Sequence, residues 1–221
     1  MAKARSEPVR EMDALQAVLK PDLKRWGFRS RARGYNRPTS DGLTQVIEFQ
    51  MGRFDPPGTY VIPGMRENLY GRFTINLGVF VPEVTRYKGV GDAAPAFVRE
   101  IDCCVRTRIG NLSPEQADLW WSLAPNPSRV DDIRTRLERD GLPFLERFGT
   151  RNKILAELAT ESGDTFARPR RIKSAIILAE LGRTDEAREL LSAQARESDS
   201  PPHTEYVREL AGKLRLGNLD V

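Results

Sequence analysis

Residues 69–81 read LYGRFTINLGVFV, and this stretch decides the fold. Apolar side chains recur at every second position, and mostly polar ones lie between them. The apolar set is Leu69, Phe73, Ile75, Leu77, Val79 and Val81, and the other set is Tyr70, Arg72, Thr74, Asn76 and Phe80. Successive side chains of a strand point to opposite faces of the sheet. The stretch therefore predicts a strand with one buried side and one solvent-facing side.

Three further stretches alternate in a similar way. They cover residues 28–37, 43–51 and 101–109. Strands this close in sequence favour an antiparallel meander with one face buried and one face wet. Residues 52–68, rich in Gly and Pro, predict a long loop between two of the strands.

A helical pattern precedes the first strand. Its apolar positions are spaced three or four residues apart, at Val9, Met12, Leu15, Leu19, Leu23 and Trp26. Pro21 lacks an N–H and crowds the preceding turn, so we expect a kink or a restart there. Gly27 predicts the end of the helix. We expect this helix to pack on the apolar face of the sheet.

From about residue 113 the periodicity becomes helical. The expected helices lie near 113–121, 128–139, 141–161, 169–181, 184–197 and 203–215. The sequence thus predicts an α+β protein, with an α+β domain at 1–125 and a helical C-terminal region at 126–221. The stretch near 170–197 resembles one tetratricopeptide-like helical hairpin. A single copy does not form a solenoid, so we interpret it as a helical pair docked on the rest of the chain.

Composition limits the partners and the compartment. The 221 residues contain 35 Lys and Arg against 31 Asp and Glu, a net charge of only +4, with both signs mixed along the chain. This balance allows a nucleic-acid partner without indicating one.

The sequence has no secretory signal and no apolar run long enough for a membrane span. Cys103 and Cys104 are adjacent and poorly placed for a disulfide with each other. We expect a cytoplasmic protein without membrane association.

Catalytic and metal motifs are scarce. The chain has one histidine, His203, in a Pro-Pro-His-Thr stretch, which favours neither a His-assisted nucleophile nor a zinc site. The phosphate-binding glycine motifs are absent. The sequence therefore predicts no catalytic residue, no metal site and no cofactor, and a protein that is not an enzyme.

The wet face of the sheet is the candidate binding surface. Its predicted members are Arg29, Arg31, Arg33, Tyr35, Glu48, Gln50, Arg72, Asn76, Arg106 and Arg108. Guanidinium groups suit carboxylates and phosphates, and Tyr35 adds stacking surface. Three interpretations stay open: a binding surface, a solvated face, or a face covered by the C-terminal helices. For Glu48 alone, a cross-strand ion pair near Arg72 or Arg106 is favoured over a catalytic carboxylate.

Several motifs in this order resemble a known bacterial family. They are Trp26-Gly27-Phe28, DGLTQVIEFQ at 41–50, FTINLGV at 73–79 and Trp120-Trp121. Together, over roughly residues 10–125, they resemble the family called domain of unknown function 4304. The resemblance implies a small cytoplasmic α+β domain. It implies no reaction, cofactor or catalytic residue.

The functional hypothesis is a protein-binding module, an immunity or accessory protein that masks another bacterial protein. By analogy, compact bacterial domains of this kind often act on protein partners. The alternative is a nucleic-acid-associated protein that uses the arginine-rich face. A face with Thr74 and Asn76 at its centre is less typical of nucleic-acid platforms, which place aromatic residues there.

Overall fold

The stretch quoted first forms the central strand of the sheet, β4 (Arg72–Phe80). The computed structural model describes residues 5–52, 68–87, 95–114, 116–160 and 170–220. In it, β4 pairs antiparallel with β3 along one edge and with β5 and β6 along the other. The odd-numbered residues from Phe73 to Val79 are fully buried, as the alternation predicts. Most of the expected loop at 52–68 lies outside the described residues.

The sheet is an antiparallel meander, which confirms the predicted α+β class. Its strands follow one another in the order β1-β2-β3-β4-β5, with β6 beside β4. The other strands are β1 (Arg29–Arg31), β2 (Gly34–Pro38), β3 (Thr44–Met51), β5 (Val105–Arg108) and β6 (Trp121–Ser122). In this register Ile47 lies opposite Leu77, and Glu48 lies opposite Asn76.

Residues 28–37 form a hairpin, so the single strand predicted there is wrong. Ala32 and Arg33 make a two-residue turn, with Ala32 at a φ of +49°. The turn places Arg31 opposite Gly34 and Ser30 opposite Tyr35. Odd positions of β1 therefore share a face with even positions of β2. As a result Arg33 lies in the turn, and Tyr35 lies on the opposite face from Arg29 and Arg31.

The N-terminal helix α1 (Glu7–Arg25) covers the apolar face, as expected. It continues through the exposed Pro21, so the expected restart is absent. Gly27, at a φ of +87°, ends it. The N–H of Phe28 bonds to the Leu23 carbonyl at 2.9 Å, and the N–H of Gly27 bonds to the Lys24 carbonyl at 3.0 Å. This is the Schellman arrangement that satisfies the last carbonyls of a helix.

The helix predicted at 113–121 is also wrong. The segment is irregular and leads into β6, where Trp121 lies opposite Phe73. The two rings stack with centroids 5.5 Å apart, and Trp121 Nε1 donates to Asp132 at 2.7 Å. Burial of this large ring against the sheet outweighs the local helical pattern.

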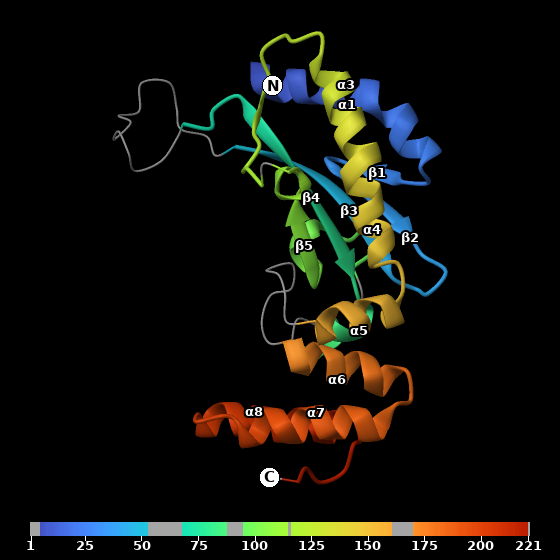
Figure 1. Cartoon of the computed structure of the whole chain (residues 1–221). Coiled ribbons are helices and arrows are strands. Elements are labelled where there is room, and N and C mark those ends of the chain that lie inside the picture. Colours follow the sequence, from blue (N-terminus) through green and yellow to red (C-terminus); the bar gives the residue numbers. More distant parts are fainter. Residues whose placement is uncertain (1–4, 53–67, 88–94, 115, 161–169, 221) are drawn as a thin grey trace.

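The remaining helices are α2 (Pro82–Arg86), α3 (Arg129–Arg136), α4 (Leu142–Arg147), α5 (Arg151–Ala159), α6 (Arg170–Glu180), α7 (Thr184–Arg196) and α8 (Pro201–Lys213). Helices α3, α6, α7 and α8 largely follow the predicted periodicity. The single helix expected near 141–161 is divided into α4 and α5, and α2 was not expected. Short tight turns are η1 (Glu100–Asp102) and η2 (Ile109–Leu112), and a π-helical turn η3 (Leu137–Gly141) joins α3 to α4. Helices α1, α3 and α4 lie over one face of the sheet (Figure 1). An ion pair of 2.9 Å from Arg134 to Asp22 joins α3 to α1.

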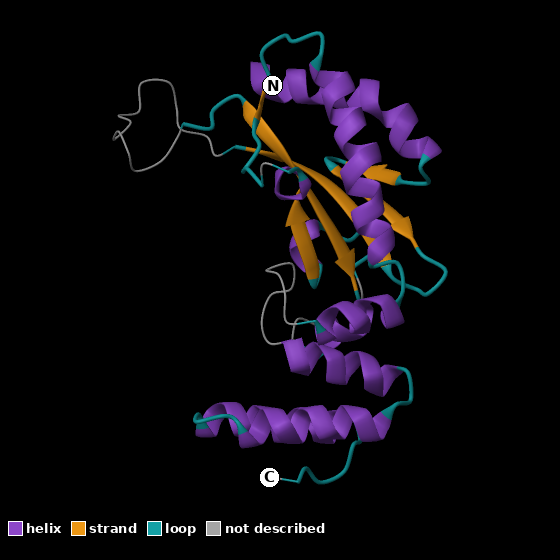
Figure 2. Ribbon diagram, viewed as in Figure 1, coloured by secondary structure: helices purple, strands orange, loops and turns teal. Residues whose placement is uncertain are grey.

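The C-terminal helices α5 to α8 lie beyond one end of the sheet (Figure 2). The main apolar cluster nevertheless runs continuously from Met12 to Leu216. At the junction, Arg151 of α5 donates two hydrogen bonds, of 2.7 and 2.9 Å, to the buried Glu83 of α2. No helix among the described residues is long and apolar enough to cross a membrane.

Candidate functional site

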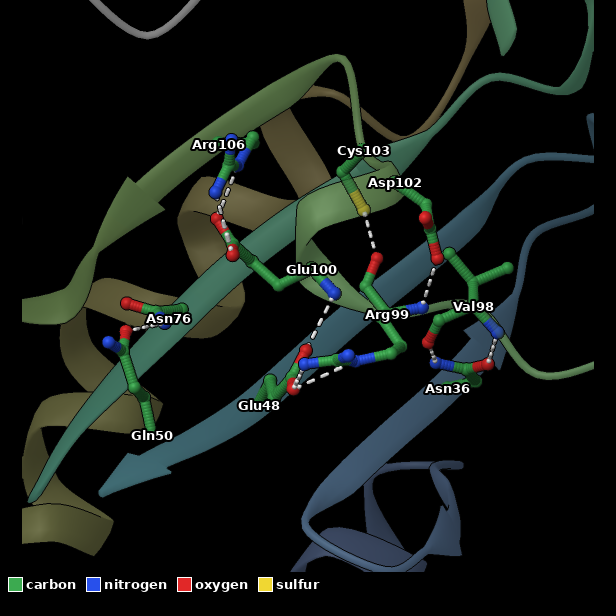
Figure 3. Close-up of polar contacts among 10 residues, drawn as sticks. All are labelled: Asn36, Glu48, Gln50, Asn76, Val98, Arg99, Glu100, Asp102, Cys103 and Arg106. Atoms are coloured by element: carbon green, nitrogen blue, oxygen red, sulfur yellow. Dashed lines mark hydrogen bonds and ion pairs between the residues drawn. The ribbon is translucent and has the colours of Figure 1, made fainter. Parts of the chain in front are cut away.

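The polar face of the sheet carries most of the predicted binding residues, and a covering segment (residues 97–103) crosses it. The segment passes over β2, β3 and β4 before the chain enters β5 (Figure 3). Asn36 of β2 holds it with a pair of hydrogen bonds to Val98. The Val98 N–H donates to Asn36 Oδ1, and Asn36 Nδ2 donates to the Val98 carbonyl, both at 2.8 Å.

Two glycines let the covering segment approach the strands closely. A Cβ at Gly34 would lie 2.9 Å from the Phe97 ring, and one at Gly78 would lie 2.7 Å from Cys103 Sγ. Cys103 packs there with Val46, Phe80 and Val98 in a small second apolar cluster. Burial raises the pKa of the Cys103 thiol well above its ordinary value, so the thiol is neutral at pH 7.

Glu48 is the polar anchor of the covering segment (Figure 3). One carboxylate oxygen accepts the Glu100 N–H at 2.8 Å, and the other accepts from Arg99 at 3.1 Å. The Glu48 side chain is 16% exposed. Glu48 thus forms an ion pair, but the cross-strand partner that was expected is wrong. Its partner is Arg99 of the covering segment, and not Arg72 or Arg106 on the neighbouring strands.

Arg106 and Arg108, both on β5, form ion pairs with carboxylates of the protein itself. Arg106 donates two hydrogen bonds to Glu100, at 2.6 and 3.0 Å, and these bonds raise the pKa of the Arg106 guanidinium. Arg108 contacts both oxygens of Asp118, at 2.6 and 2.7 Å, and lies over the Trp120 ring. Both guanidinium groups are therefore partly neutralised within the protein.

The centre of the polar face is less exposed than the alternation predicts. Asn76 is 7% exposed, and its Nδ2 donates to Gln50 Oε1 at 2.7 Å. Thr74 is fully buried, and its hydroxyl oxygen has no hydrogen-bond partner among the described residues. The expectation that Thr74 and Asn76 face solvent is therefore wrong.

The described part of the polar face contains a pocket of about 1040 Å³. It lies between the first turns of α1, the β1–β2 turn, the end of β3 and the covering segment. Six of the ten predicted site residues line it, namely Arg31, Arg33, Glu48, Gln50, Asn76 and Arg106. Arg29 is exposed on β1 outside it, and Arg72 and Arg108 lie on β4 and β5 away from it. Tyr35 is 2% exposed in the core and accepts a hydrogen bond from Gln16, so its predicted stacking role is wrong.

Sequence reasoning missed the covering segment. The alternation at 101–109 predicts one strand, but Ile101 lies in η1 and is 64% exposed. Cys103 and Cys104 are both buried, in apolar clusters on opposite faces of the sheet. Two apolar neighbours in a row break the alternation, and this break is the signal that the strand begins later.

The carboxylates of the pocket do not form a metal-ligating cluster. Within the residues described, no group of three or more His, Cys, Asp or Glu side chains converges. Each carboxylate that lines the pocket instead contacts an arginine. The arrangement is suited to binding polar and charged groups through hydrogen bonds.

The fold and the site define an α+β protein with a polar pocket on one face of an antiparallel meander. Residues 65–147 match the family described as domain of unknown function (DUF4304), which confirms the family resemblance. The matched segment begins just before β4 and ends with α4, so it starts and ends later than the range 10–125 expected from the motifs. No curated protein and no solved structure matches the chain. The tetratricopeptide-like resemblance of α6 and α7 stays a prediction.

Proposed function

We propose that this protein is a cytoplasmic protein-binding module of the immunity or accessory type, which masks a bacterial partner through the pocket on its polar face. The mixed character of the pocket rim carries the proposal. Ile101 is 64% exposed, and the half-buried Phe97 lines the same pocket among arginines and carboxylates. Apolar side chains exposed beside charged groups are typical of interaction sites between proteins.

Masking requires a fitted surface and no catalytic group. The covering segment supplies such a surface, because Asn36, Glu48 and Arg106 fix it to three strands. A surface that is ordered before binding loses less conformational entropy when the partner arrives. The support for the proposal is thus a rigid, concave and chemically mixed rim.

The nucleic-acid alternative has less support from the same residues. Arg106 and Arg108 are each paired with an internal carboxylate, so fewer cations are left to neutralise phosphates. Tyr35 lies in the core and offers no base-stacking surface. These contacts lower the positive charge that a phosphate backbone would meet on this face.

Site-specific photo-crosslinking in cells that naturally contain the protein tests the proposal. A photo-crosslinking amino acid in place of Ile101 should give one discrete protein adduct. The same amino acid in place of Tyr206, which is 39% exposed on α8, serves as the control and should not give that adduct. Adducts with nucleic acid, or the same adducts from both positions, would contradict the proposed function.

A further inference from the structure

The charges of the pocket do not balance. Among the described residues, five arginines and three carboxylates line it: Arg5, Arg31, Arg33, Arg99, Arg106, Asp13, Glu48 and Glu100. Each carboxylate contacts one arginine, in the pairs Asp13–Arg5 at 2.5 Å, Glu48–Arg99 at 3.1 Å and Glu100–Arg106 at 2.6 Å. Arg31 and Arg33 remain, and no hydrogen bond or ion pair joins either guanidinium to the rest of the described chain. Among the described residues, the lining of the pocket therefore leaves two arginines without a carboxylate partner.

These two arginines come from one short turn. Arg31 ends β1, and Arg33 is the second residue of the turn into β2. The Arg33 carbonyl accepts the Phe49 N–H at 3.0 Å, which ties the turn to β3. The backbone of the turn is thus fixed while both guanidinium groups are available, an arrangement suited to bidentate recognition of oxyanions.

Gln50 adds a third donor. Asn76 Nδ2 donates to Gln50 Oε1, which assigns the acceptor atom of Gln50 to an internal bond and leaves its Nε2 as a donor (Figure 3). Gln50 is exposed, and its Nε2 has no acceptor among the residues described. Asn76 is therefore a positioning residue for Gln50. Each carboxylate among the described lining residues is already paired with an arginine, so the remaining donors favour a ligand that brings acceptor oxygens.

Resting on the proposed function, we propose that the pocket binds an acidic peptide segment of the partner protein. Carboxylates of the segment pair with Arg31 and Arg33, and a further oxygen accepts from Gln50. An adjacent apolar side chain packs against Phe97 and Ile101, which a free inorganic anion would leave uncovered. The volume of about 1040 Å³ lies at the upper end of the range for small-molecule sites and accommodates a short peptide.

Selection from a random dodecapeptide library tests this inference. The full-length protein is used for selection, with counter-selection on the Arg31→Ala/Arg33→Ala variant. Enriched peptides should combine Asp or Glu with an apolar residue. Their Kd should rise about 10- to 100-fold in the double variant, because charge-assisted hydrogen bonds are lost. The Lys213→Ala/Arg215→Ala variant removes two exposed cations at the end of α8 and should leave Kd unchanged.

Three further measurements decide the outcome. Enriched peptides whose Asp and Glu residues are replaced by Asn and Gln should bind at least about tenfold more weakly. The two double variants of the protein should have the same thermal unfolding midpoint. Enrichment of peptides without acidic residues, or binding that survives the Arg31→Ala/Arg33→Ala change, would overturn the inference. The inference would also be overturned if an oligothymidylate probe bound the protein more tightly than the enriched peptides do and lost this binding in the Arg31→Ala/Arg33→Ala variant. If the crosslink at position 101 still captures a protein, only the inference falls and the proposed function stands.

Discussion

The two faces of the sheet use the same strands in different ways. On one face, Ile47 and Leu77 lie opposite each other beneath α1, α3 and α4, within the main apolar cluster. On the other face, the adjacent residues Glu48 and Asn76 lie opposite each other beneath a polar covering segment and beside a pocket. Adjacent residues of one strand thus have different roles: one stabilises the fold, and the next faces the binding side. Neighbouring substitutions therefore test the two faces independently.

The largest expected difference is between Leu77→Ala and Thr74→Val. Both side chains are fully buried, so burial alone does not distinguish them. Leu77→Ala leaves a cavity between sheet and helices and should lower the free energy of unfolding by about 2–5 kcal/mol. Thr74→Val keeps the shape and removes a hydroxyl without a partner, so it should change that free energy by about 0–1 kcal/mol in the stabilising direction. Urea unfolding measures both, and equal losses would show that the faces are not distinct.

The second difference concerns the anchor of the covering segment. Glu48→Gln replaces a carboxylate oxygen by an N–H₂ group that opposes the donors of Arg99 and Glu100. The expected loss in the free energy of unfolding is about 1–3 kcal/mol, with faster hydrogen exchange at the Glu100 amide. Glu138→Gln, in a 3.7 Å surface pair with Arg25, is the control and should cost no more than about 1 kcal/mol. Unchanged exchange at Glu100 would rule out Glu48 as the anchor.

The smallest expected effect on stability concerns the ion pair between α1 and α3, and it depends on pH. The hydrogen bond from Arg134 holds the pKa of the buried Asp22 below its ordinary value of 3.8. A carboxyl with a lowered pKa in the folded state stabilises the fold above its unfolded pKa, and this contribution disappears as pH falls through the folded value. The stability difference between the parent and Asp22→Asn should therefore be present at pH 7 and shrink below pH 3.8.

Urea unfolding over a pH series measures this difference. Asp199→Asn, at an exposed position, controls for the general loss of one negative charge. A stability difference for Asp22→Asn that persists unchanged at the lowest pH would contradict the assigned role of the Arg134 hydrogen bond.

The meander was predictable because apolar residues recur at every second position over most of β3 and β4, with Gln45, Val46 and Phe80 as exceptions. Their apolar residues determine which face is buried, whatever the loops do. The exchange of faces in the β1–β2 hairpin was not predictable from alternation, since Arg29, Arg31, Arg33 and Tyr35 continue the period through the turn. The two-residue turn at Ala32–Arg33 carries no glycine that would mark it, although Ala32 adopts a positive φ.

The candidate site was predictable only in part. Six of its residues project from strands whose register follows from the pattern, or from the turn beside them. The partners of those residues come from long-range contacts, such as Glu48 with Arg99, 51 positions apart, and Asn36 with Val98, 62 positions apart. No local spacing encodes such pairs. The pairing decides which arginines stay available, so the sequence alone could not single out Arg31 and Arg33.

The bond pair between Asn36 and Val98 has a consequence for how this molecule can vary. An asparagine amide that bonds the N–H and the carbonyl of one residue recognises main-chain atoms, which every residue except proline provides. This bond pair therefore sets no demand on the exposed side chains of the segment, whereas Glu100 and Cys103 make contacts of their own. Exposed positions such as Ile101 are free to change between related proteins while the segment keeps its place. A fixed path with replaceable side chains would allow one scaffold to acquire different partners.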